Sequence, residues 1–184
     1  MRNNQFLHNR ARGALLQTPY GLVEGNTFSG QMMYPLLLTT FPPEGPGAQN
    51  LLIANNQISD SGVGGGPGAI IIARQQLVYS ALAHNPPAQQ NLIFVDNLIH
   101  DVPGPAFYIS SANAMVLYRN TLQNTNYQTT NNKWNGAGDI NSSIVINDAS
   151  NILLRRNSIH PAPEVKTPIS VDAGTTTGIE ISER

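Results

Sequence analysis

The sequence predicts an all-β protein folded as a right-handed parallel β-helix of about six coils. Three observations support this prediction: a short repeated segment built on asparagine, many turn-forming residues and few charged residues. The 184-residue chain contains 16 Gly and 13 Pro, and only 11% of its residues are charged. Glycine, proline and asparagine form turns and disfavour helices, so this composition favours short strands joined by sharp corners.

The repeat consists of a short apolar run, an asparagine, one residue of any type, and an aliphatic or aromatic residue. Six segments follow this pattern, and their key asparagines are Asn4, Asn26, Asn56, Asn97, Asn120 and Asn157. Successive asparagines are 22, 30, 41, 23 and 37 residues apart. We interpret the shorter spacings as one coil and the longer spacings as one coil with an inserted loop.

A second apolar strand is expected after each asparagine. These strands are predicted at residues 14–17, 36–39, 69–72, 106–109, 144–147 and 169–171, and a final apolar run covers residues 178–181. Such units leave no room for a helical crossover, so each strand should pair in parallel with its equivalent in the next coil. Stacking would then bury a column of aliphatic and aromatic side chains that one coil could not bury alone.

The repeated asparagines are predicted to have a structural role. A corner between two strands needs a positive φ or a side chain that bonds to its own backbone, and asparagine can supply both. Asparagines of successive coils would lie about 4.8 Å apart, the spacing of paired strands. Their amides can then form a ladder of hydrogen bonds, so we do not expect them in an active site.

The chain is predicted to form a single domain, residues 1–184, with loop insertions near residues 40–50, 75–91 and 123–141. Long excursions from a compact scaffold are where binding residues concentrate. Neither end of the predicted stack carries a polar cap, and uncapped ends expose apolar side chains and unpaired strands. We therefore expect either the C-terminal part of a longer protein or a homo-oligomer formed through these ends.

Composition excludes several functional classes. The formal net charge is −1 and no basic patch is evident, so a nucleic-acid partner is not expected. No apolar run approaches the roughly 20 residues of a membrane span, and the N-terminus lacks the apolar segment of a signal peptide. Cysteine is absent and the four histidines are not spaced as ligands, so no metal and no cofactor is predicted.

Two aspartates are the first candidate catalytic pair. Asp60 and Asp101 each follow a repeat asparagine, Asn56 or Asn97, by four residues, so they should lie in one column on adjacent coils. Carboxylates about 5 Å apart would raise the pKa of one of them, which suits a general acid beside a base. A separation of about 5–5.5 Å would suit a retaining glycosidase and a wider one an inverting enzyme. The alternative is two solvated turn aspartates.

Five further residues are candidates for catalysis or sugar binding. Glu44 lies in the first long loop and could act as an acid or base, and His100, which precedes Asp101, could be a general acid or base or bind substrate. Arg10 and Arg12 could clamp a carboxylate or sugar hydroxyls, and Trp134, the only tryptophan, could stack on a sugar ring. The alternatives are a surface carboxylate, a surface histidine, arginines that cap the stack, and a tryptophan that packs its loop.

The N-terminal third resembles a known family. It is similar to glycoside hydrolase family 110 and its uncharacterised relatives in three successive segments. These are Asn9-Arg10-Ala11-Arg12-Gly13, Asn26-Thr27-Phe28, and Glu44-Gly45 before another apolar strand that contains asparagine. Members of this family are β-helix proteins that include exo-acting α-1,3-galactosidases. The resemblance covers about the first 60 residues. It implies inverting hydrolysis by carboxylates on one face of the helix, with Glu44 at the best-matching functional position.

The sequence therefore predicts a carbohydrate-active β-helix protein with a polysaccharide or oligosaccharide as its partner. The first hypothesis is a glycoside hydrolase relative, or a fragment of one, that acts on a galactoside or another polysaccharide. The second is a non-catalytic carbohydrate-binding or structural module, and the third is a polysaccharide lyase or epimerase. The native full-length protein is expected to be secreted or periplasmic. Whether the chain is an enzyme depends on how its carboxylates are arranged.

Overall fold

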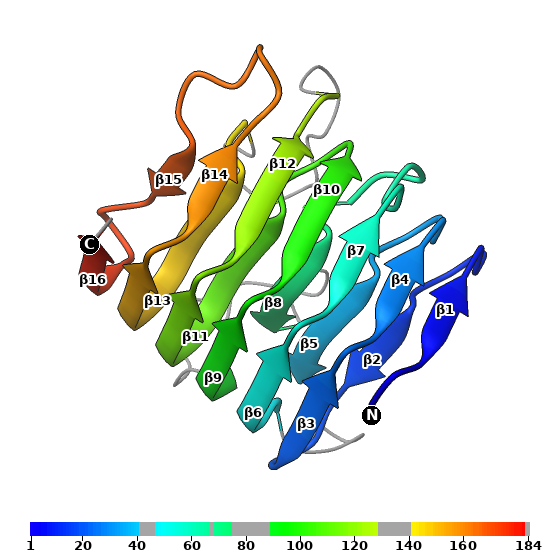
Figure 1. Cartoon of the computed structure of the whole chain (residues 1–184). Coiled ribbons are helices and arrows are strands. Elements are labelled where there is room, and N and C mark those ends of the chain that lie inside the picture. Colours follow the sequence, from blue (N-terminus) through cyan, green and yellow to red (C-terminus); the bar gives the residue numbers. More distant parts are fainter. Residues whose placement is uncertain (41–46, 67, 75–88, 129–140, 183–184) are drawn as a thin grey trace.

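The computed structural model describes residues 1–40, 47–66, 68–74, 89–128 and 141–182, and these residues form strands without any helix (Figure 1). No helix in this described part is long and apolar enough to cross a membrane. The strands are β1 (Gln5–Leu7), β2 (Ala14–Leu16), β3 (Gly21–Glu24), β4 (Thr27–Ser29), β5 (Leu36–Thr40), β6 (Gln49–Ala54), β7 (Gln57–Ser59), β8 (Ile70–Arg74), β9 (Gln89–Val95), β10 (Leu98–Val102), β11 (Phe107–Tyr118), β12 (Thr121–Thr125), β13 (Ile144–Arg155), β14 (Ser158–His160), β15 (Ile169–Val171) and β16 (Thr177–Ser182).

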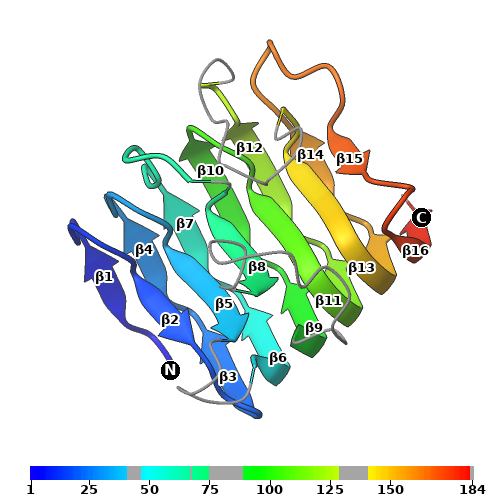
Figure 2. The ribbon, with the colours of Figure 1, turned by 180° about the vertical axis from the view of Figure 1, so that it is seen from behind.

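The strands pair only in parallel, each with its equivalent in the neighbouring coil. One sheet has six strands in the order β1-β4-β7-β10-β12-β14, and we call it the six-stranded sheet. A second, larger sheet contains the remaining strands and bends around a corner (Figures 1 and 2). The architecture is an all-β right-handed parallel β-helix, so the predicted fold class is confirmed.

The bend in the larger sheet runs through β11 and β13. The first residues of β11 pair with β8 and its later residues pair with β9, so one strand serves two faces of the helix. The sequence predicted a separate strand at residues 106–109, but the chain stays paired through the corner. Left-handed backbone conformations at Ser111 and Ala114 turn the strand without ending it.

Inward-facing side chains form continuous apolar columns along the stack. Phe28, Ile58, Ile99 and Leu122 lie in register on the six-stranded sheet and are all fully buried. The ring of Phe6 stacks on Phe28 with 4.8 Å between centroids and 7° between planes, which extends this column into the first coil. Because each coil covers its neighbour, the core is as long as the stack itself.

The predicted asparagine ladder is present. Each side-chain amide of the repeat asparagines donates to Oδ1 of the next asparagine at 2.9–3.1 Å, and each backbone N–H donates to the same oxygen at 3.0–3.1 Å. The amides also reach carbonyls of a neighbouring coil, as in the 3.0 Å bond from Asn56 to the oxygen of Val23. The ladder thus satisfies polar groups at an otherwise apolar corner.

The expectation that these asparagines adopt the positive φ of the corner is wrong. The positive φ lies one residue earlier, at values between 53° and 64°, in Asn3, Gly25, Asn55, Asp96, Arg119 and Arg156. The repeat asparagine is already extended enough to enter the next strand, and its side chain points along the stack rather than to its own turn. At each corner, the residue before the repeat asparagine therefore supplies the positive φ, and the asparagine supplies the side-chain hydrogen bonds.

Candidate functional site

A second column of left-handed residues lies at the other edge of the six-stranded sheet. It contains His8, Gly30, Asp60, Asp101 and Asn124, with φ between 46° and 73°. The backbone N–H of Asp60 donates to the carbonyl oxygen of Asp101 at 3.2 Å, so these two aspartates are direct neighbours on adjacent coils. The sequence predicted this juxtaposition from their equal distance to the repeat asparagines. We call the polar side chains at this place the aspartate corner, formed by Gln57, Asp60, His100, Asp101, Asn124 and Tyr127.

The carboxylate of Asp101 is held by two neighbours. The side-chain amide of Asn124 donates to Oδ1 at 2.7 Å, and Nδ1 of His100 lies 2.7 Å from Oδ2. The hydrogen bond from Asn124, followed by that from His100, holds the pKa of Asp101 below its ordinary value. The sequence predicted that the close pair would raise a carboxyl pKa, and for Asp101 the direction is opposite because these donors favour the ionised form.

His100 joins the two coils at this corner. Its Nε2 lies 3.1 Å from Nε2 of Gln57 on the neighbouring strand β7. The nitrogen of a carboxamide only donates, so in this arrangement Nε2 of the imidazole accepts and Nδ1 carries the proton that bonds Asp101. The side chain of His100 is 23% exposed, which leaves it reachable from the surface.

Tyr127 is within reach of the charges of both aspartates. Partial burial raises the pKa of its phenol, and the negative charges of Asp60 and Asp101 raise the pKa further. The side chain still exposes 37% of its surface, so ring and hydroxyl are accessible. The sequence did not single out Tyr127, because it follows β12 outside the repeat. In the sequence, only the position of Tyr127 three residues after Asn124 could have indicated that it lies near the aspartate corner.

The outer face of the six-stranded sheet next to this corner is polar. Its outward positions are Thr27, Gln57, Leu98, Thr121 and Ser158 in one row, and Ser29, Ser59, His100, Gln123 and His160 in the next. Some of these groups bond to one another, as in the 3.2 Å hydrogen bond from Ser59 Oγ to Ser29 Oγ. Hydroxyl, amide and imidazole groups on a flat surface can exchange hydrogen bonds with sugar hydroxyls.

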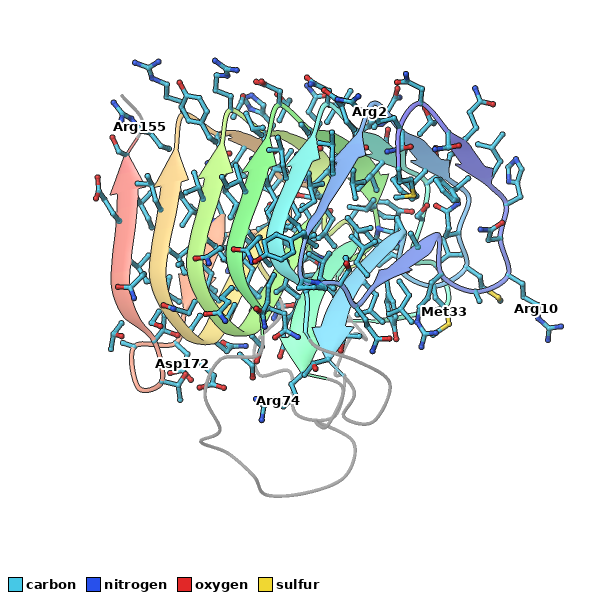
Figure 3. The ribbon with its side chains drawn as sticks, turned by 90° about the horizontal axis from the view of Figure 1, so that it is seen from below. Arg2, Arg10, Met33, Arg74, Arg155 and Asp172 are labelled. Carbon is cyan, nitrogen blue, oxygen red and sulfur yellow. The ribbon has the colours of Figure 1, made fainter. Side chains whose placement is uncertain are left out.

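The two predicted arginines are not brought to Asp101. Arg10 and Arg12 lie between β1 and β2 in the first coil, two coils before Asp60. Arg10 is exposed and points away from the stack (Figure 3), and the guanidinium of Arg12 lies 5.9 Å from the ring centroid of Tyr34. Glu44 and Trp134 fall outside the described residues. Within the described ranges, no three His, Cys, Asp or Glu side chains are grouped to hold a metal ion.

Two hollows lie away from the aspartate corner. One, of about 370 Å³, lies at the last coil and is lined mainly by apolar side chains that include Leu154, Ile159 and Ile169. The other, of about 120 Å³, lies beside Ser111 and Asp148 on the larger sheet. At the aspartate corner the side chain of Asp101 is 49% exposed, so a ligand can reach it from solvent.

Comparison with known proteins agrees with the fold. A family model described as a right-handed β-helix region matches residues 1–183. No curated protein and no solved structure matches the chain significantly. The match is to the fold family as a whole, so the resemblance to glycoside hydrolase family 110 stays a prediction.

Proposed function

Because the chain belongs to the family of right-handed β-helix proteins, we propose that it is a carbohydrate-active protein related to glycoside hydrolases. In this proposal it binds a galactoside or another polysaccharide across the outer face of the six-stranded sheet and cleaves it at the aspartate corner. The observation that carries the proposal is the pair of Asp60 and Asp101 on adjacent coils, joined by a backbone hydrogen bond. Paired carboxylates on one face are what glycoside hydrolysis requires.

The surroundings of the two aspartates suggest which role each takes. Asp101 is held ionised by Asn124 and His100, so it is suited to accept a proton from an attacking water. Asp60 then serves as the acid that protonates the glycosidic oxygen of the leaving group. The bond from the anomeric carbon to that oxygen breaks while the bond from the anomeric carbon to the water oxygen forms. A water that attacks directly in this way gives hydrolysis with inversion, which needs the two carboxyl groups to stand wider apart than the strand spacing, at about 6.5–9.5 Å. The family resemblance implies the same outcome.

A second candidate function is a non-catalytic carbohydrate-binding module. The observation in its favour is that both aspartates adopt left-handed turn conformations and that both oxygens of Asp101 already accept hydrogen bonds. A turn aspartate bound in this way can position amide and imidazole groups for sugar hydroxyls without taking part in a reaction. The two functions share the same binding face and differ only in turnover.

The test is a screen for binding and hydrolysis with three variants. Binding and hydrolysis of aryl α-galactosides and a panel of polysaccharides are measured for the parent chain, Asp60→Asn and Asp101→Asn. The matched control is Asp172→Asn, in the turn between β15 and β16. For a hydrolase we expect Asp60→Asn and Asp101→Asn to lose activity by about 100-fold or more, with binding kept. The parent and the control should be equally active.

The other outcomes separate the alternatives. Binding without turnover by the parent, weakened in Asp101→Asn, would establish the binding module in place of the hydrolase. Absence of both binding and turnover across the panel would refute a carbohydrate-active function. Glu44→Gln, assayed in parallel, tests the residue that the family resemblance favours, because its activity should then fall while Asp60→Asn remains active.

A further inference from the structure

Arginines gather at the edge of the six-stranded sheet opposite to the aspartate corner. Among the residues that the structure describes, four of the ten Lys and Arg residues of the chain lie here: Arg2, which pairs with Glu24 in the first coils, and Arg119, Arg155 and Arg156 at the ends of β11 and β13. Tyr118 is paired in register with Arg155, and the backbone N–H of Arg119 donates to the carbonyl oxygen of Arg155 at 3.1 Å. Figure 3 shows Arg155 on this edge, toward the last coil of the stack.

The ring of Tyr118 connects two of these arginines. The guanidinium of Arg119 lies over the ring, 4.7 Å from its centroid, and Nη1 of Arg156 donates to the phenol oxygen at 3.2 Å. Arg119 is fixed further by Asp96, whose Oδ1 accepts from its Nε at 2.7 Å while Oδ2 accepts from Nη2. We call Asp96, Tyr118, Arg119 and Arg156 the arginine edge.

The charges of the arginine edge do not balance. Arg119 and Arg156 occupy the same corner position on adjacent coils, about 4.8 Å apart along the stack. Among the described residues, Asp96 is the carboxylate that pairs with Arg119, whereas the side-chain bond of Arg156 goes to a neutral phenol. Within the arginine edge two guanidinium charges therefore accompany one carboxylate charge, and a bound anion would offset the remaining positive charge. Both arginines are exposed, so an anion can reach them from solvent.

The arginine edge borders the same face as the aspartate corner. From Arg119 the chain runs directly into β12, whose outward side chains Thr121 and Gln123 lead to Asn124 at the opposite edge. From Arg156 it runs in the same way into β14. A polymer bound across this face therefore meets carboxylates and an imidazole at one edge and guanidinium groups at the other.

We infer that the arginine edge binds an anionic group, a carboxylate or a sulfate, carried by the polysaccharide that lies on the six-stranded sheet. This inference rests on the proposed function and narrows its substrate to an acidic polymer. Arg156 supplies a planar fork that matches the geometry of carboxylate and sulfate oxygens. Tyr118 and Asp96 hold the guanidinium groups in place, so little side-chain freedom is lost on binding.

The test compares three polymers and three variants. Binding of polygalacturonate, a sulfated galactan and a neutral galactan is measured by affinity electrophoresis for the parent chain, Arg156→Gln, Arg156→Lys and Lys166→Gln. Lys166 is exposed and lies between β14 and β15, so Lys166→Gln matches the change in charge away from this edge. The two acidic polymers distinguish a carboxylate ligand from a sulfate ligand.

We expect the parent to bind at least one acidic polymer more tightly than the neutral galactan. Arg156→Gln should weaken that binding by about tenfold or more, the effect of losing one charged hydrogen bond, and leave neutral galactan unaffected. The affinity of Arg156→Lys for the acidic polymer should lie between those of the parent and Arg156→Gln, since lysine keeps the charge and lacks the planar guanidinium group. Lys166→Gln should bind like the parent, and added salt should weaken the acidic polymer more in the parent than in Arg156→Gln.

Two results with the variants would overturn the inference. One is equal binding of the acidic polymer by the parent and Arg156→Gln, and the other is an equal loss in Lys166→Gln, which would indicate general charge attraction. Neutral galactan bound without any preference for acidic polymers would refute this inference and leave the proposed function standing. No binding of any of the three polymers by the parent, in a chain whose melting temperature shows it to be folded, would refute both.

Discussion

Asn56 donates two hydrogen bonds to one oxygen of Asn97. Its backbone N–H lies 3.0 Å and its side-chain amide nitrogen 2.9 Å from Oδ1 of Asn97, and the two residues expose only 2% and 1% of their surface. The side-chain amide of Asn97 donates in turn to Ile53 and Asn120. The ladder therefore joins coils that are distant in sequence through buried groups that have no water to replace a lost partner.

Asn97→Ala should destabilise the fold by about 1–3 kcal/mol, the cost of leaving buried polar groups unsatisfied. The substitution removes four hydrogen bonds made by this side chain, two accepted from Asn56 and two donated. Asn56→Ala should have a similar effect, since it occupies the neighbouring step. Urea denaturation followed by circular dichroism measures the change in the free energy of unfolding.

Asn113→Ala is the control for this prediction. Asn113 is partly exposed, and its Oδ1 accepts from Ser150 and Asn151, so water can replace both donors. Its loss should cost about 1 kcal/mol or less. If Asn56→Ala and Asn97→Ala both unfold at the urea concentration of the parent, the ladder does not stabilise the stack.

The pKa of Asp101 predicts a pH dependence of stability. Hydrogen bonds from Asn124 and His100 lower the pKa of this carboxyl in the folded chain, while the unfolded chain keeps a value of about 3.9. The stabilising contribution of the carboxylate is therefore complete above that value and is lost as the pH falls through the folded-state pKa. Asp96 adds a contribution of the same sign, because its hydrogen bond with Arg119 lowers its pKa.

Asp101→Asn isolates this contribution. Asparagine tolerates the left-handed φ of 53° at this position, so the corner itself should be preserved. The variant should melt below the parent at about pH 7, and the gap should narrow as the pH falls below about 3.9, because the unfolded parent then takes up a proton that the folded carboxylate does not. A gap in melting temperature that stays constant over this range would contradict the lowered pKa.

The sequence predicted the stack and its ladder because both depend on local repetition. Equal offsets from the repeat asparagine put Asp60 and Asp101 in one column, and the structure places them so. The positive φ of the asparagine corner was assigned one residue too late, because glycine, asparagine, aspartate and arginine all occur at the preceding position. A position occupied by such different residues carries no composition signal.

The environment of the aspartates could not be predicted in the same way. The direction of the pKa of Asp101 depends on Asn124, which is supplied by the next coil. Tyr127 reaches the aspartate corner from beyond the end of β12, where the repeat no longer fixes which way a side chain points. The arginine edge was missed for a related reason, because the repeat does not show that Arg119 lies over the ring of Tyr118 while Arg156 bonds to its hydroxyl.

Gly13, the glycine of the Asn-Arg-Ala-Arg-Gly segment, lies where two neighbouring coils are in close contact. A Cβ atom at this position would lie 2.4 Å from the backbone oxygen of Pro35 and 2.7 Å from Cδ1 of Phe28. The oxygen of Pro35 accepts from the N–H of Ala14 at 2.8 Å, and Phe28 is fully buried, so neither can move aside without loosening β2 or the core. The glycine is thus needed for the close approach of two coils.

Gly13→Ala should therefore destabilise the chain by about 1–3 kcal/mol, the usual cost of forcing an extra carbon into a packed site. Gly174→Ala is the matched control, because the nearest atom to its Cβ would be a carboxylate oxygen of Asp172 at 3.3 Å, which can rotate away. The control should change stability by no more than about 0.5 kcal/mol. Equal urea midpoints for the two variants would show that the first two coils can separate to admit a methyl group, and that the glycine of this segment is not required by packing.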